Sequence, residues 1–187
     1  MKYLVTGLGN IGSEYAHTRH NIGFDILDAL AGASNIVFKD QRYGSYVELK
    51  HKGRTYCLLK PSTYMNLSGN AVRYYLQSLK LPVDRLLVVA DDIALPFGTI
   101  RMRAKGGNAG HNGLGHINQI LGGSKYARLR FGVGSDFGQG QQAYYVLGEW
   151  DSEEKKALPE RIDIAKDAIL AFGVLGIERA MNFYNGK

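Results

Sequence analysis

The sequence predicts an α/β fold: a single domain with a mixed, mostly parallel central sheet flanked by helices. Its length of 187 residues suits one compact domain, which we take as residues 1–187. Hydrophobic residues make up 45% of the chain and charged residues 21%, enough to build an ordinary buried core. Segments with strand and helix patterns alternate along the chain, which is typical of parallel strands joined by helices.

The N-terminal half is expected to hold four strands and two helices. Apolar side chains between residues 21 and 30 fall on one helical face. Lys52-Gly53 predicts a turn between two strands, and Pro61 ends the second of them. The expected strands are residues 2–6, 36–38, 45–49 and 55–59, and the expected helices are residues 21–30 and 69–79.

The C-terminal half begins with a continuous apolar strand, residues 86–90, of the kind that is buried on both faces of a sheet. Residues 128–133 alternate basic and apolar side chains, which predicts a half-buried strand. Asp151 and Glu154 have the spacing of a helix-capping pair, and Pro159 follows where a proline can split a helix. The other expected elements are a strand at residues 99–103 and helices at residues 114–121, 152–172 and 177–184.

Composition narrows the class of protein. Cys57 is the single cysteine, so an intramolecular disulfide and a paired-cysteine zinc site are both excluded. No apolar signal region precedes the first strand, and the longest apolar run, residues 168–177, is far below the roughly 20 residues that span a bilayer. We expect a cytoplasmic protein that does not enter a membrane.

The net charge of +6 is concentrated in the middle of the chain. No acidic residue occurs between Glu48 and Asp84 or between Asp92 and Asp136. Two acid-free windows favour a polyanionic partner, nucleic acid first, although a solvated basic surface would give the same count. The bases in these windows are Lys50, Lys52, Arg54, Lys60, Arg73 and Lys80, then Arg101, Arg103, Lys105, Lys125, Arg128 and Arg130.

A glycine motif follows the first strand. Gly7-x-Gly9-x-x-Gly12 has the literal spacing of a dinucleotide-binding loop, which would make the protein an oxidoreductase. That motif needs a helix that opens at its third glycine, whereas apolar periodicity here begins only near Asn21. The dinucleotide hypothesis therefore stays an alternative.

His20 and Asp91 are the first candidates for catalysis. An imidazole titrates near neutrality and suits a general base, although a lone histidine is more often structural. Asp91 ends the most apolar strand, where ligands gather in α/β sheets, and a carboxylate can orient an imidazole. Asp92 competes with Asp91 for this role, and spacing does not choose between them.

Three asparagines lie in loops that leave strands or are rich in glycine: Asn10, Asn66 and Asn112. A neutral amide can bind a peptide group or stabilise an oxyanion, although asparagine also favours loops for conformational reasons. No serine nucleophile elbow is present, and Cys57 falls inside an expected strand, where it is core.

Four segments together resemble the bacterial peptidyl-tRNA hydrolases, in the order in which that family has them. The first segment is Gly7-Leu8-Gly9-Asn10-Ile11-Gly12-Ser13-Glu14-Tyr15, which continues after two residues as Thr18-Arg19-His20-Asn21. The second is Lys60-Pro61-Ser62-Thr63-Tyr64-Met65-Asn66. The others are Asp91-Asp92-Ile93-Ala94-Leu95-Pro96 and Gly110-His111-Asn112-Gly113. The resemblance implies a monomeric α/β hydrolase, without metal or cofactor, that cleaves the ester between a peptide and the terminal ribose of tRNA.

The resemblance also assigns roles by position. It places the general base on His20 and the orienting carboxylate on Asp91, with Asn10 beside them in the catalytic set. Substrate-binding positions fall on Tyr15, Met65, Asn66 and Asn112, and tRNA-binding positions fall on Arg103, Lys105 and Arg130. A non-catalytic RNA-binding relative is a second alternative beside the dinucleotide-dependent oxidoreductase, because the same fold could hold RNA without hydrolysing it.

Overall fold

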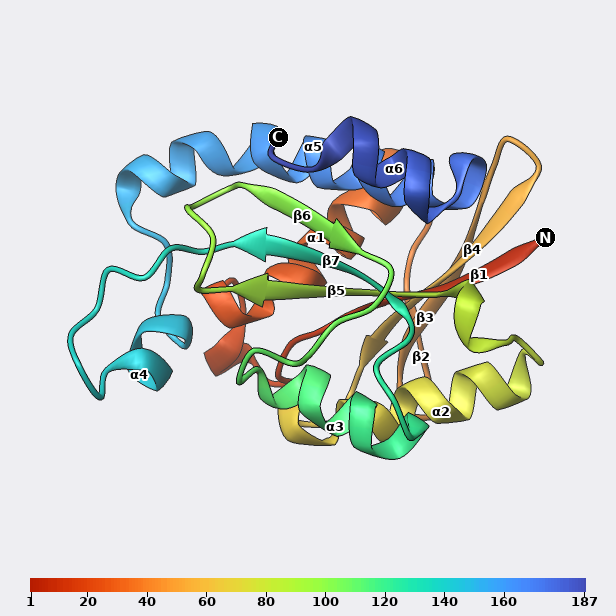
Figure 1. The fold of residues 1–187 in the computed structure, drawn as a ribbon, viewed down its shortest axis with the longest axis horizontal. Coiled ribbons are helices and arrows are strands. Elements are labelled where there is room, and N and C mark those ends of the chain that lie inside the picture. Colours follow the sequence, from red (N-terminus) through yellow and green to blue (C-terminus); the bar gives the residue numbers. More distant parts are fainter.

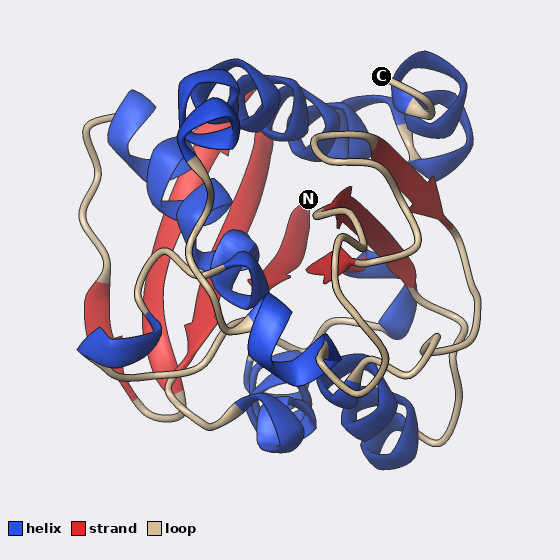
Figure 2. Cartoon of the chain, turned by 90° about the vertical axis from the view of Figure 1, so that its left-hand side faces the viewer, coloured by secondary structure: helices blue, strands red, loops and turns tan.

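A computed structural model describes residues 1–187 as a seven-stranded sheet between two layers of helices (Figures 1 and 2). The predicted fold class is confirmed. The strands are β1 (Lys2–Gly7), β2 (Lys39–Gln41), β3 (Gly44–His51), β4 (Arg54–Pro61), β5 (Leu86–Asp92), β6 (Ile100–Arg103) and β7 (Ala127–Gly132). The helices are α1 (Ile22–Ala33), α2 (Ser68–Ser78), α3 (Asn112–Leu121), α4 (Gln142–Val146), α5 (Ser152–Leu175) and α6 (Ile177–Tyr184).

The strand order, β2-β3-β4-β1-β5-β7-β6, sets the position of the functional loops. The central neighbours β4, β1, β5 and β7 run parallel, whereas β2, β3 and β6 add antiparallel edges. The carboxyl ends of the four parallel strands therefore meet at one edge of the sheet. In open α/β sheets this edge is where ligands bind.

Each face of the sheet buries its own apolar cluster. Val5 and Val89 point toward α1 and α5, whereas Leu4 and Val88 point toward α2 and α3. This alternation follows from the two-residue period of a strand, and it explains why β1 and β5 are apolar at nearly every position. Figure 1 shows α5 and α6 on one side of the sheet and α2 and α3 on the other.

Two expected strands differ from the structure. Residues 36–38 are not a strand; Ile36 and Phe38 pack against the core. Strand β2 begins only at Lys39 and pairs with β3 through a tight turn at Tyr43, which has a φ of 65°. The strand at 128–133 is nearly wholly buried rather than half-buried. Arg128 is fully buried there because its guanidinium finds backbone carbonyls as partners.

The C-terminal third also differs from expectation. The capping box of Asp151 and Glu154 is confirmed, but Pro159 does not split α5, which continues unbroken. Pro159 is exposed, so water can bond the Lys155 carbonyl that loses its helical partner. The short helix α4 was not predicted. None of the helices has the length and apolar character that crossing a membrane requires.

Candidate active site

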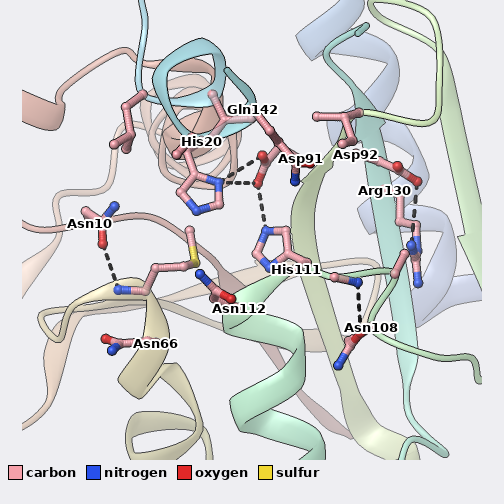
Figure 3. A pocket seen from close by; sticks show the side chains of 17 residues that line it. Asn10, His20, Asn66, Asp91, Asp92, Asn108, His111, Asn112, Arg130 and Gln142 are labelled. Carbon is pink, nitrogen blue, oxygen red and sulfur yellow. Dashed lines mark hydrogen bonds and ion pairs between the residues drawn. The ribbon is translucent and has the colours of Figure 1, made fainter. Parts of the chain in front are cut away.

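A cavity of about 510 Å³ opens at the carboxyl edge of the parallel strands. Its walls come from the loops after β1 and β4, the end of β5, the loop before α3, and α4 (Figure 3). Parts of the chain that are far apart in sequence therefore face one space. Of the residues proposed from the sequence, seven line it: Asn10, His20, Met65, Asn66, Asp91, Asn112 and Arg130.

His20 and Asp91 lie in direct contact. The Nδ1 atom of His20 is 2.9 Å from Oδ2 and 3.0 Å from Oδ1 of Asp91. A carboxylate accepts hydrogen bonds, so Nδ1 carries the proton and Nε2 keeps its lone pair. His20 belongs to a 3₁₀ turn, Arg19–Asn21, that leads into α1, while Asp91 is on buried β5. The sheet thus fixes the carboxylate, and the carboxylate fixes the ring.

This pairing shifts both pKa values. Burial alone would lower the pKa of His20, but the charge and the hydrogen bond of Asp91 outweigh it and raise that pKa above its ordinary value of 6.5. Burial opposes ionisation of Asp91, yet the two imidazoles beside it hold its pKa well below the ordinary 3.8. Asp91 therefore stays charged at every pH at which His20 titrates.

His111 is a third member of this group, and the sequence analysis did not propose it as a site residue. Its Nε2 donates to Oδ1 of Asp91 at 2.8 Å. Its Nδ1 accepts the backbone N–H groups of Gly113 and Leu114 and so caps α3. The signal in the sequence was its place in Gly110-His111-Asn112, immediately before an expected helix.

His20, Asp91 and His111 also bring three potential metal ligands within 4.8 Å of one another. The hydrogen bonds of His111 do not favour a metal there. Because its Nδ1 accepts two amide protons, its own proton lies on Nε2, the atom that would have to coordinate. The protonation pattern suits proton transfer around a shared carboxylate instead.

The backbone of Asn10 is held at both its N–H group and its carbonyl group. Its backbone N–H donates to Oδ1 of Asn21 and its carbonyl accepts from Nδ2 of Asn21, each at 2.9 Å. Its side-chain Oδ1 accepts the backbone N–H of Met65 at 2.7 Å. The remaining amide hydrogens of Asn10 are left for a ligand, and Figure 3 shows that nitrogen on the side of His20. The sequence analysis missed Asn21, which is buried and orients Asn10.

The other predicted substrate-binding residues divide into two groups. Asn66 and Asn112 line the cavity together with buried Met65, from the loop after β4 and from the first residue of α3. Tyr15 does not line it; this half-buried residue ends a 3₁₀ turn in the loop after β1.

The predicted tRNA-binding residues are also spread out. Arg130 lines the cavity, and its Nη2 donates to the Gly107 carbonyl at 2.6 Å. Its Nη1 lies 3.6 Å from Oδ2 of Asp92. Arg103 and Lys105 are exposed on and just after β6, outside the cavity.

The dinucleotide hypothesis finds no support in the structure. Helix α1 begins at Ile22, ten residues beyond Gly12, so no helix N-terminus opens where a pyrophosphate would sit. The glycines serve close packing instead. A Cβ on Gly7 would meet the carbonyl oxygen of Gly23 at 2.3 Å, and one on Gly9 would meet the Phe24 ring at 2.9 Å.

The sequence and the fold of this chain are similar to those of one known family. The family model for peptidyl-tRNA hydrolase matches residues 4–187. Peptidyl-tRNA hydrolases of Phocaeicola vulgatus and Cytophaga hutchinsonii are 59% and 56% identical to this chain, each over 100% of both sequences. A crystal structure of peptidyl-tRNA hydrolase from Acinetobacter baumannii has a TM-score of 0.91 and 34% identity, and the match covers 98% of this chain and 94% of that one. This chain belongs to the peptidyl-tRNA hydrolase family.

Proposed function

We propose that this protein hydrolyses the ester bond between a peptide, or an N-blocked aminoacyl group, and the terminal ribose of tRNA. The observation that carries the proposal is the His20–Asp91 pair, whose free Nε2 faces a cavity lined by neutral amides. The family membership supplies the substrate class. The reaction returns tRNA from stalled peptidyl-tRNA to use.

In this mechanism Nε2 of His20 takes a proton from a water molecule, which attacks the ester carbonyl. Asp91 keeps Nδ1 protonated and stabilises the imidazolium that forms, because its carboxylate remains ionised. The free amide N–H groups of Asn10 lie where they can donate to the developing oxyanion. The imidazolium then returns its proton to the departing ribose oxygen.

The remaining roles follow the walls of the cavity. Met65 offers an apolar contact, and Asn66 and Asn112 offer donors and acceptors to the peptide near the ester. Tyr15, in the loop after β1, lies outside the cavity, and we propose that it contacts the part of the bound substrate that extends beyond the cavity. Arg130 at the cavity, with Arg103 and Lys105 outside it, supplies cations for the RNA backbone. We propose that the enzyme acts as a monomer in the cytoplasm, without metal or cofactor.

The test is release of a labelled N-acetyl-aminoacyl group from tRNA. We expect hydrolysis by the wild type, no hydrolysis of unblocked aminoacyl-tRNA, and a loss of about 10²–10⁴-fold in His20→Ala, because a general base contributes that much. His20→Ala should bind tRNA within a few-fold of the wild type. His51→Ala is the matched control, because His51 ends β3 away from the cavity.

Two results would overturn the proposal. Retention of most activity in His20→Ala would remove His20 as the base. Tight tRNA binding by a wild type that cleaves nothing would indicate an RNA-binding relative instead.

A further inference from the structure

We propose that Asp92 sets the affinity of this enzyme for RNA by occupying Arg130. In the free protein Nη1 of Arg130 faces the Asp92 carboxylate, and in the complex it faces an RNA phosphate, so binding exchanges one oxyanion partner of Arg130 for another. The inference rests on the proposed function, which supplies the RNA. It assigns Asp92 a role distinct from that of its neighbour Asp91.

Asp92 takes no part in the hydrogen-bonded group of His20, Asp91 and His111. Both imidazoles of that group bond to Asp91, and neither bonds to Asp92. Successive side chains of a strand point to opposite faces, so the two carboxylates diverge at the end of β5. Figure 3 shows Asp92 turned toward Arg130 and Asp91 turned toward the histidines.

The Asp92 carboxylate is anchored independently of the arginine. Its Oδ1 accepts the backbone N–H of Ala94 at 2.8 Å, which fixes the carboxylate at the start of the loop after β5. Its Oδ2 faces Nη1 of Arg130 at 3.6 Å, an ion pair that is too long for a hydrogen bond. The Nη1 group of Arg130 is therefore held by charge alone. A phosphate oxygen at hydrogen-bonding distance would be a stronger partner for Nη1 than the Asp92 carboxylate is.

The rest of Arg130 stays in place during such an exchange. Its Nη2 donates to the Gly107 carbonyl at 2.6 Å. Fully buried Arg128 bonds to that same carbonyl at 3.2 Å and to the Ser124 carbonyl at 2.7 Å. The two arginines of β7 thus fix the glycine-rich loop before α3 at Gly107. Arg130 can turn Nη1 toward a phosphate without releasing the loop that carries His111.

This arrangement weakens the hold on RNA. The Asp92 carboxylate attracts Nη1 of Arg130, and this attraction must be given up when Nη1 turns to a phosphate. Giving it up costs affinity for RNA. An enzyme that must release deacylated tRNA after every turnover benefits from such a partner. Removal of the Asp92 charge should therefore tighten the complex with RNA, although the chain already carries a net charge of +6.

The experiment measures the Kd of fluorescently labelled deacylated tRNA at fixed low salt. Asp92→Asn keeps an acceptor for the Ala94 N–H and removes only the charge that faces Arg130. We expect its Kd to fall roughly three- to tenfold. Asp92→Ser also keeps a local acceptor and gives the same expectation, should the asparagine variant fold poorly. Asp84→Asn is the matched control, because this exposed acid lies at the opposite end of β5 and should change Kd less than about twofold.

A double-mutant cycle isolates the pair. In an Arg130→Gln background, Asp92→Asn should tighten binding clearly less than in the wild type, because no guanidinium remains to be released and only the field of the carboxylate is removed. Equal tightening in both backgrounds would show a general field effect and overturn the assignment. Unchanged or weaker binding by Asp92→Asn in the wild-type background would overturn it as well. A wild type that neither binds tRNA nor cleaves the blocked substrate would instead reject the proposed function, and this inference with it.

Discussion

Asp91 is shared by two imidazoles, and its charge controls how the proposed base titrates. Because Asp91 raises the pKa of His20 above 6.5, wild-type kcat/KM should rise with pH through a midpoint above 6.5, where His20 loses its proton. Asp91→Asn removes the charge that holds the proton on His20. The midpoint should move to lower pH while the plateau falls by about 10²–10⁴-fold, because the ring loses its orientation.

The measurement is a pH profile of the hydrolysis of N-acetyl-aminoacyl-tRNA. Asp92→Asn is the matched variant, because it removes the adjacent carboxylate, which contacts neither imidazole, and should shift the midpoint far less. A midpoint that stays in place in Asp91→Asn would show that this charge does not tune the base.

The residues of the active site differ in how far the sequence predicts them. His20 and Asp91 were candidates because an imidazole suits a general base and an acid that ends an apolar strand lies where ligands gather, and the family resemblance chose Asp91 over Asp92. His111 and Asn21 carry no such signal of residue type, because their roles come from the side-chain and backbone partners that the fold gives them. His111 bonds to a carboxylate 20 residues earlier, and Asn21 bonds to the peptide unit of Asn10, 11 residues earlier. Spacing along a loop does not reveal such pairs.

At the scale of the element, α1 carries a partly buried acid, Asp25, in its first turn. Burial raises the pKa of Asp25 to about 6, although a hydrogen bond of 3.1 Å from His17 opposes the shift. The folded state then binds more protons than the unfolded state between pH 3.8 and about 6, so stability falls as pH rises through that window. The ionised carboxylate is thus a cost to folding at neutral pH.

Asp25→Asn should therefore increase the free energy of unfolding at pH 7.5 by about 1–3 kcal/mol and flatten its change between pH 4.5 and 7.5. Urea unfolding at the two pH values tests this. Asp28→Asn, the same substitution on the exposed side of α1, should keep most of the pH dependence, because burial raises the Asp25 pKa more than the charge of Asp28 does. If Asp25→Asn lost stability at pH 7.5, its bond with His17 would outweigh the burial.

Elements with strong periodicity were predictable, and those set by tertiary context were not. Helix α6 has the expected bounds, 177–184, because its pattern is local. Helix α4 was missed because its anchor is remote: the ring of Tyr145 lies 4.1 Å below the Arg19 guanidinium, and its hydroxyl donates to the Val133 carbonyl. That anchor places Gln142 and Val146 in the cavity wall.

At the scale of the whole molecule, charge distribution and topology both bear on where we propose that RNA approaches. Arg130 lies at the cavity, and Arg103 and Lys105 are exposed in the same acid-free window. Fold class followed from the alternation of strands and helices. The meeting of four loops at one sheet edge depended on strand order, which no local pattern encodes.

If this window holds the acceptor stem, tRNA binding must depend on salt. Each phosphate neutralised on a duplex contributes about 0.9 to the slope of log Kd against log salt. Lys105→Gln should reduce the slope by about 1 and weaken binding without lowering kcat, because Lys105 lies outside the cavity. Lys50→Gln makes the same change at an exposed position of β3, in the other acid-free window, and should leave the slope unchanged. Equal slopes for both variants and the wild type would mean that the second window is only a solvated basic surface, and that Arg130 meets the RNA without help from it.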